Sequence, residues 1–134
     1  MGMAREILFR GKRISDGKWV EGDLNRCIVV GKTYICKIEE NISTTTHEID
    51  SATVCQYTGY ADLRKKKVFE HDIVFCENNG CHGHVEFENG KFEIKWEAKK
   101  ENLRNDIHFW FKERRMYVVN NIFDNPELME EGSQ

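Results

Sequence analysis

The sequence has no long apolar run, a single proline and an odd number of cysteines, five in all. A helix that crosses a membrane needs about 20 apolar residues in succession, so we expect no membrane association. No apolar leader opens the sequence, and an odd cysteine set argues against a disulfide framework. We therefore expect a cytoplasmic protein with reduced thiols, in which Cys27 and Cys36 serve as small buried apolar residues.

Catalytic motifs are missing as well. No nucleophile stands beside a base in a known pattern, no glycine-rich phosphate loop occurs, and no two acids are spaced to converge. Asp16, Asp23, Glu70 and Asp72 stand at turn-like positions, where carboxylates accept backbone N–H bonds. We predict that the protein is not an enzyme and uses no cofactor.

The charge balance also argues against a strong general attraction to nucleic acid, because the formal net charge is -3 and a whole-domain positive field is absent, although a local basic patch remains open. The composition is otherwise that of an ordinary globular protein, with 40% apolar and 11% aromatic residues for a core. There are no repeats and no Pro-rich or Gly/Ser-rich linker, so residues 1–134 are predicted to form a single domain.

What the sequence does contain is turn chemistry between short apolar runs. Ser-Asp-Gly at 15–17 separates residues 5–13 from 18–24, and Gly31-Lys32 separates residues 28–30 from 34–38, which predicts two hairpins. The polar, Thr-rich stretch 41–51 suits an exposed loop or a sheet edge.

The central stretch, residues 56–73, is expected to hold one strand that ends at Thr58-Gly59, then a charged excursion to Lys67 and a return strand. Asp72 stands where a turn meets that buried strand, so its carboxylate is expected to accept backbone N–H bonds. Asn-Gly pairs then join residues 68–76, 83–87 and 92–96 into an antiparallel meander, with Cys76 half-buried.

The last third of the sequence is less definite. Residues 99–115 fit both a helical stripe and a strand alternation, and a short helix is favoured. Residues 117–119 and 122–123 predict a final strand. Asn125 and Pro126 then suit the start of a short C-terminal helix, with residues 129–134 frayed.

Five blocks, in order and spacing, resemble the YopX family: 9–13 (FRGKR), 17–24 (GKWVEGDL), 56–59 (QYTG), 68–74 (VFEHDIV) and 121–128 (NIFDNPEL). The resemblance implies a protein of phages and prophages, in the cytoplasm of a bacterial host, without an assigned activity. It also implies the fold class, which is mainly β: a small partly open SH3-like β-barrel with hairpin additions and a short C-terminal helix.

The sequence departs from the family pattern at three usual glycines, which are replaced by Lys65, His71 and Asn120. Glycine at a turn supplies a positive φ, which Asn tolerates better than His or Lys. We therefore expect an altered excursion at 62–67, and a turn at 70–72 that holds under strain or changes its φ.

A metal site is one interpretation of Cys76, Cys81, His82 and His84, because a hairpin tip could bring thiolates and imidazoles together. The spacing is not that of paired zinc knuckles, and strand alternation places His82, His84 and Glu86 on one face. We predict a surface hairpin and no bound metal.

Two kinds of partner remain. The first is protein: an unidentified partner or a second copy, which would make a homo-oligomer, bound at unprotected sheet edges. The second is nucleic acid, bound by basic runs that include 10–13 and 112–115, with Trp19, Trp96 and Trp110 as stacking faces, although such runs are usually solvated loops. The candidate residues for nucleic acid are Arg64, Lys65, Lys66, Lys67, Arg114 and Arg115.

Overall fold

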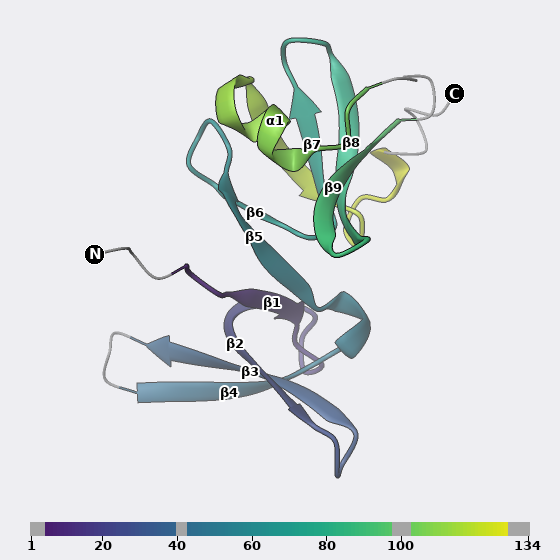
Figure 1. The fold of residues 1–134 in the computed structure, drawn as a ribbon. Helices are drawn as coiled ribbons and strands as arrows, with labels where there is room; N and C mark the ends of the chain where they lie inside the picture. The colour runs from purple at the N-terminus through teal and green to yellow at the C-terminus, as the bar shows by residue number, and fades with distance from the viewer. Residues whose placement is uncertain (1–4, 40–42, 98–102, 129–134) are drawn as a thin grey trace, which may run out of the picture. The chain divides into compact units, whose positions relative to one another are not determined.

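The computed structural model describes residues 5–39, 43–97 and 103–128 (Figure 1). The chain divides into two compact units, Met1–Tyr57 and Thr58–Gln134. Both consist chiefly of antiparallel strands, so the mainly β class is confirmed. The single domain expected over residues 1–134 stays a prediction.

The first unit is an antiparallel meander followed by a 3-10 turn and a strand that continues into the second unit. Its elements are β1 (Phe9–Lys12), β2 (Trp19–Cys27), β3 (Lys32–Glu39), β4 (Ser43–Ile49), η1 (Ser51–Thr53) and the beginning of β5 (Cys55–Ala61). Neighbours in the sheet follow the order β4-β3-β2-β1, and the start of β5 pairs with β1 on its other side. The 15–17 hairpin is confirmed, since β1 pairs with β2 across it.

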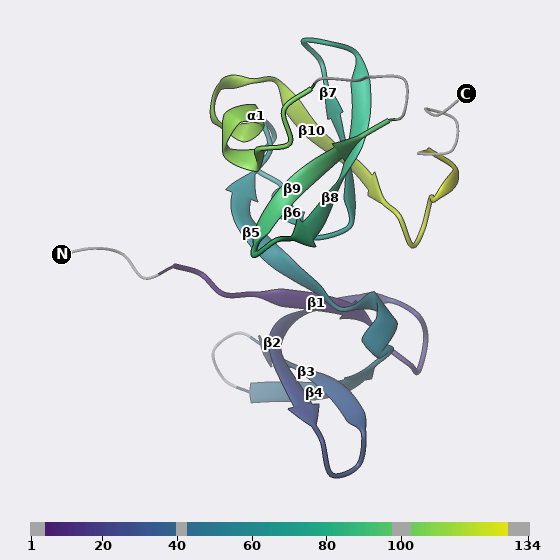
Figure 2. The same cartoon turned by 45° about the vertical axis from the view of Figure 1, so that its right-hand side comes forward.

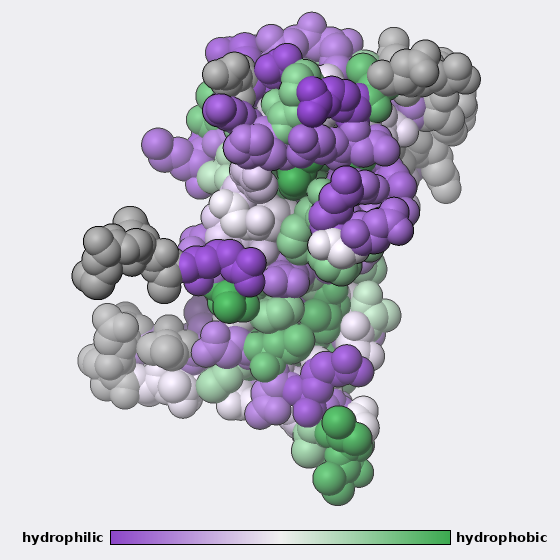
Figure 3. Space-filling view, in the orientation of Figure 1, coloured by the Kyte–Doolittle hydropathy of each residue, from purple (hydrophilic) through white to green (hydrophobic). Residues whose placement is uncertain are grey.

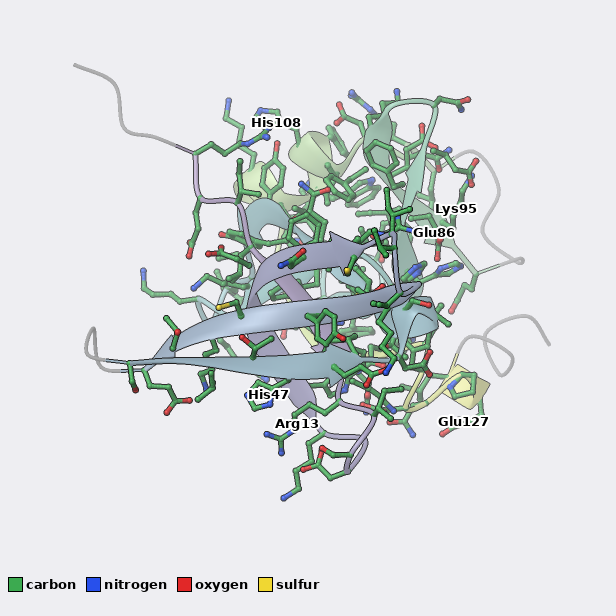
Figure 4. The ribbon with its side chains drawn as sticks, turned by 90° about the horizontal axis from the view of Figure 1, so that it is seen from below. Arg13, His47, Glu86, Lys95, His108 and Glu127 are labelled. Carbon is green, nitrogen blue, oxygen red and sulfur yellow. The ribbon has the colours of Figure 1, made fainter. Side chains whose placement is uncertain are left out.

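This unit curls until the end of β4 meets the end of β1. Ile49 of β4 forms a bridge with Arg13, and the Asp50 N–H donates to the Lys12 carbonyl at 2.9 Å. Figure 4 shows Arg13 and His47, which come from these two segments, on the same side of the unit. No other pairing is formed by this edge of β4 among the described strands, so the unit is a partly open barrel; its likeness to SH3 folds stays a prediction.

The long strand β2 makes this curl, because it pairs with β1 up to Gly22 and with β3 from Asp23 onward. A Cβ on Gly22 would stand 2.3 Å from the Cys36 carbonyl oxygen, so only glycine lets β3 pass this closely. The curl encloses a small core of Val20, Ile35 and Ile49, against which Phe9, Leu24 and Val54 pack.

The prediction of a strand at residues 28–30 is wrong. β2 ends at Cys27, which pairs with Lys32, so residues 28–31 form the turn between β2 and β3. Gly31 closes that turn at φ +67°. Cys27 and Cys36 are also more exposed than expected, since both are half-buried, whereas Cys55 is buried.

The second unit contains a four-stranded antiparallel sheet in the order β10-β7-β8-β9, with a helix beside it (Figure 2). Its elements are the end of β5, β6 (Lys67–Phe69), β7 (Asp72–Cys76), β8 (Cys81–Glu88), β9 (Lys91–Trp96), α1 (Ile107–Glu113) and β10 (Met116–Asn121). The predicted meander is confirmed in β7, β8 and β9, which are joined by turns at Gly80 and Gly90.

The ambiguous stretch before β10 contains a helix, as favoured from the sequence. The carboxylate of Asp106 caps it by accepting from the His108 N–H at 3.0 Å. Ile107 and Trp110 then reach the core formed by Val74, Val85, Ile94 and other buried residues of the sheet. Residues 98–102 lie outside the described part of the chain.

Two predicted strand ends are wrong. β5 does not stop at Thr58-Gly59 but continues to Ala61, because the Thr58 hydroxyl donates to the Val68 carbonyl at 2.8 Å and Gly59 bends the strand at φ +92°. β10 ends at Asn121, before the predicted 122–123 segment. The Asn121 side chain accepts from the Phe123 and Asp124 N–H groups, which makes a turn.

The predicted C-terminal helix is described only at its start. Residues 127–128 are helical, and the Leu128 N–H donates to the Asn125 carbonyl at 3.2 Å. The expected fraying at 129–134 lies outside the described residues.

Two of the three departures from glycine keep the glycine conformation. Lys65 has φ +68° and His71 has φ +71°, so the excursion at 62–67 forms its tight turn without the change we expected. Asn120 differs, because its φ is not positive and it follows a bulge in the pairing of β10 with β7. The prediction for Asp72 is confirmed: the side chain is 1% exposed, and its Oδ2 accepts from the Phe69 N–H at 2.7 Å.

Candidate functional site

The second unit has a half-open pocket of about 290 Å³ between the turn after β5 and the connection from α1 to β10. We call it the cationic pocket. Its lining combines apolar and basic side chains: Ala61, Asp62, Leu63, Phe111, Lys112, Arg114, Arg115 and Met116. The basic lining residues all come from the 112–115 segment, and the basic turn at 64–66 directly follows residues 61–63, which line the other side.

Asp62 fixes the geometry of the pocket. One carboxylate oxygen accepts from the Arg64 and Lys66 N–H groups, and the other accepts from the Val118 N–H, all at 2.9 Å. The Leu63 N–H also donates to the Met116 carbonyl at 3.0 Å. The turn and β10 are therefore held together by hydrogen bonds at the floor of the pocket.

Aromatic rings and hydroxyl groups position the guanidinium groups around the pocket. Arg64 lies over the ring of Tyr117 at 4.6 Å, and Arg114 lies over the ring of Phe109 at 4.0 Å. Arg115 donates to the Tyr117 hydroxyl at 3.1 Å and to Glu77, and the bond to Glu77 raises the pKa of Arg115. These contacts restrict the side chains of Arg64 and Arg114, and neither guanidinium forms an ion pair with another residue that the structure describes.

The candidate residues predicted from the sequence are divided by the structure. Arg114 and Arg115 line the pocket, Arg64, Lys65 and Lys66 belong to its turn, and Lys67 is the first residue of β6. The basic run 10–13 belongs to the other compact unit. Sequence reasoning did not find the roles of Asp62, Phe109 and Tyr117. The Asp62–Val118 bond and the Arg64–Tyr117 contact join residues far apart in the chain and carry no local pattern, whereas the turn bonds of Asp62 and the Arg114–Phe109 contact are local and were missed.

The tryptophans do not offer the predicted stacking faces. Trp110 is buried, and Trp96 packs edge-on against it with 4.7 Å between ring centroids. Both indole N–H groups donate to the Arg104 carbonyl. Trp19, in the first unit, has the guanidinium of Arg10 over its ring at 4.7 Å.

The suggested metal ligands face opposite sides of β8. Cys81 and its neighbour across the sheet, Cys76, are both buried, which corrects the half-buried position expected for Cys76. His82 and His84 point to the other face together with Glu86, as predicted. Within residues 5–39, 43–97 and 103–128, no three His, Cys, Asp or Glu side chains converge as metal ligands would. The expectation of no bound metal stays a prediction.

The outward face of β8 carries a polar network instead. Glu86 Oε2 lies 2.8 Å from His84 Nδ1 and 3.1 Å from His71 Nδ1. Lys95 lies near Glu86 on the neighbouring strand (Figure 4), and its bond to Glu88 raises the pKa of Lys95. The network satisfies these groups with one another.

A second candidate surface lies in the first unit, at the turn between β2 and β3. Ile28 is 91% exposed, Val29 is 94% exposed and Val30 is 57% exposed. We call these residues the hairpin tip. Figure 3 shows this apolar group projecting from the lower end of the unit. A shallow pocket of about 240 Å³ adjoins it, with Arg26, Cys27 and Thr33 in its lining.

In the part of the chain that the structure describes, no helix is both long enough and apolar enough to cross a membrane.

These observations define a mainly β protein built on antiparallel sheets, with a cationic pocket and an apolar hairpin tip. The family model described as YopX protein matches residues 8–130, so the chain belongs to the YopX family. The crystal structure of protein EF1440 from Enterococcus faecalis is similar, with a TM-score of 0.58 and 16% identity over 94% of this chain and 99% of that chain. At this identity the likeness shows the fold alone. No curated protein matches the sequence.

Proposed function

We propose that this YopX-family protein is a non-catalytic accessory protein of phages or prophages, which acts in the bacterial cytoplasm by binding protein, including its own copies. The observation that carries the proposal is the hairpin tip. Three adjacent aliphatic residues are exposed at the end of a hairpin, and two of them, Ile28 and Val29, stand almost fully in solvent.

Exposure of this kind is unfavourable for a protein that stays alone. Burial of apolar surface contributes roughly 25 cal/mol per Å², so a partner that covers three aliphatic side chains gains several kcal/mol. Single exposed apolar residues are common on protein surfaces, but a contiguous group is typical of an interaction site. The open edge of β4, with its three threonines and no proline or lysine, offers backbone groups to the same partner.

Light scattering across a range of protein concentrations tests the proposal. We expect the mean mass to rise with concentration for the natural protein. Replacing Ile28 and Val29 by Ser should return the protein to a monomer. At concentrations where the natural protein is itself monomeric the two should melt at the same temperature, because neither side chain is part of the core. Ile14→Ser is the matched control, since Ile14 is 59% exposed in the same unit and is not part of the hairpin tip.

The proposal would be left without support if the protein stays monomeric at every concentration and if no other protein binds it in a way that requires the hairpin tip. Equal effects of the Ile14 and Ile28/Val29 variants would also contradict it, since the tip would then have no special role.

A second candidate function is binding of nucleic acid in the second unit. It is favoured by the basic residues Lys112, Arg114 and Arg115 in the lining of one pocket, whose other side is formed by residues 61–63, next to the basic turn 64–66. Fluorescence anisotropy with single-stranded and duplex oligonucleotides at two ionic strengths tests it. Phosphate contacts release counterions, so the affinity must fall steeply as salt rises.

A further inference from the structure

We propose that the cationic pocket binds one phosphomonoester, meaning a small organic molecule with a single terminal phosphate group. The proposal goes beyond protein binding. The proposed site uses the same cations as the nucleic-acid candidate function, but its ligand is not a nucleic-acid strand.

The charges around the pocket favour a compact anion with more than one negative charge. Lys112, Arg114 and Arg115 line it, and Arg64 stands on the adjoining turn. Arg115 is already bonded to Glu77, so Arg64, Lys112 and Arg114 are the groups that remain for a ligand. A phosphomonoester carries a charge of about -1.5 to -2 at neutral pH on three oxygens, which matches a few convergent cations better than a carboxylate does.

Asp62 reduces this positive field but does not cancel it, because it is one negative charge against the cations of Arg64, Lys112 and Arg114. Its carboxylate accepts from three backbone N–H groups, which stabilise the charge where it is. The same bonds fix the turn that carries Arg64, while the rings of Tyr117 and Phe109 fix the guanidinium planes. A site whose cations are already positioned loses less conformational entropy when an anion binds.

The size and the walls of the pocket point to a small ligand. A volume of about 290 Å³ lies at the lower end of the range for small-molecule sites, roughly 300–1,000 Å³. Leu63 and Phe111 provide apolar walls next to the cations, so one compact organic group fits beside the phosphate.

A strand of nucleic acid fits less well, because single-strand sites combine a basic groove with aromatic faces for successive bases. Two rings near the pocket are already covered: Phe109 by the guanidinium groups of Arg104 and Arg114, and Tyr117 by that of Arg64. Phe111 is then a single aromatic side chain in the pocket lining, not a row of faces for successive bases. Trp110 is buried. The pocket therefore suits one phosphate group better than a row of nucleotides.

The test is to titrate the full chain separately with adenosine 5′-monophosphate, adenosine and inorganic phosphate at constant ionic strength. Binding is monitored by the chemical shifts of the backbone amides. We expect saturable binding of the monophosphate, with the largest shifts at Leu63, Lys112 and Arg114. Inorganic phosphate should bind at the same amides more weakly, and adenosine should not bind.

Lys112→Gln and Arg114→Gln should each lower the affinity for the monophosphate about tenfold, which is the effect of losing one charge-assisted hydrogen bond. Lys91→Gln is the matched control, because Lys91 is an exposed lysine of β9 outside the pocket lining. The control should leave the affinity unchanged, and melting temperatures should show that all variants fold.

Any of these results would overturn the proposal: no binding at millimolar monophosphate, equal binding of adenosine, an equal loss in the Lys91 control, or equal binding of an Asp/Glu-rich peptide. Short oligonucleotides with and without a 5′-phosphate separate it from the nucleic-acid candidate. If the two oligonucleotides bind equally and the monophosphate does not bind, the result would support the nucleic-acid candidate and refute the proposal of a phosphomonoester site. Preference for the phosphorylated oligonucleotide over the free monophosphate would identify a strand end as the ligand and overturn the small-molecule assignment.

Discussion

Asp62 and Asp72 are buried carboxylates that complete backbone hydrogen bonding at neighbouring turns. Asp62 accepts from N–H groups of its own turn and of β10, and Asp72 accepts from Phe69. Buried backbone donors are almost always paired in native proteins, so a side chain that pairs them becomes part of the fold. Each of these residues therefore acts on stability first.

Asp72→Ala should lower the free energy of unfolding by about 1–3 kcal/mol, because the Phe69 N–H would remain buried without its acceptor. Urea unfolding measures the change. The control is Asp23→Ala, an exposed aspartate of β2, which should change stability by less than about 0.5 kcal/mol. A wild-type stability for Asp72→Ala, together with a loss of partner binding, would place Asp72 on a functional surface instead.

Lys65→Gly should raise the stability of the protein. A left-handed conformation costs a residue with a Cβ about 1–2 kcal/mol, and Lys65→Gly removes this cost. Glycine also loses more backbone entropy on folding, which reduces the gain by about 0.5–1 kcal/mol. A net gain of about 0.5–1 kcal/mol is expected, because Lys65 has φ +68° and is exposed. Thermal and urea unfolding should agree on the sign. Lys66→Gly is the comparison, since Lys66 has no positive φ and should lose stability instead.

At the scale of elements, the sequence predicted hairpins well and strand limits poorly. Asn-Gly and Asp-Gly turns are local, so β1–β2 and the β7–β8–β9 meander could be predicted from neighbouring residues. Residues 28–30 have strand composition but form a turn. The turn begins there because Cys27 pairs with Lys32, which leaves residues 28–31 to connect the two strands. Such pairing depends on both strands, so the composition of one segment does not predict it.

The candidate site was predictable in part for the same reason. Basic runs at 64–67 and 112–115 are visible in the sequence, but their meeting depends on Asp62, which joins its own turn to β10. The aromatic partners of Arg64 and Arg114 are likewise found only in three dimensions. The identity of the cations could therefore be read from the sequence, whereas their convergence could not.

The crossing of β2 and β3 gives an element-level prediction. Gly22→Ala should destabilise the protein by about 1–3 kcal/mol, because the new methyl group would meet the Cys36 carbonyl oxygen at 2.3 Å and backbone must move. Urea unfolding measures the loss, with Asn25→Ala as an exposed control on the same strand. An unchanged midpoint for Gly22→Ala would show that the crossing is looser than the structure indicates.

For the whole molecule, we predict that protein purified without added metal contains far less than one zinc per chain. The buried thiols of Cys76 and Cys81 and the outward imidazoles of His82 and His84 lie on opposite faces of the sheet, and a tetrahedral ion needs its ligands on one side. Elemental analysis checks this. A value near one zinc per chain would contradict it, and these four residues would be the first to mutate.

Each compact unit has a core of its own, around Ile35 in the first and around Val74, Val85 and Ile94 in the second. β5 begins in one unit and ends in the other. The two candidate surfaces are divided in the same way, with the hairpin tip in the first unit and the cationic pocket in the second. Substitutions at one surface should therefore leave the core of the other unit unchanged.

The position of Cys27 makes the hairpin tip accessible to spectroscopy. Its half-buried thiol lines the pocket beside the tip, while Cys55, Cys76 and Cys81 are buried and should react slowly with thiol reagents. With Cys36 replaced by Ser, a maleimide fluorophore would attach mainly next to the tip. The emission of that dye would then report in real time when a partner covers Ile28 and Val29, and it would do so in a cell lysate as well as with purified protein.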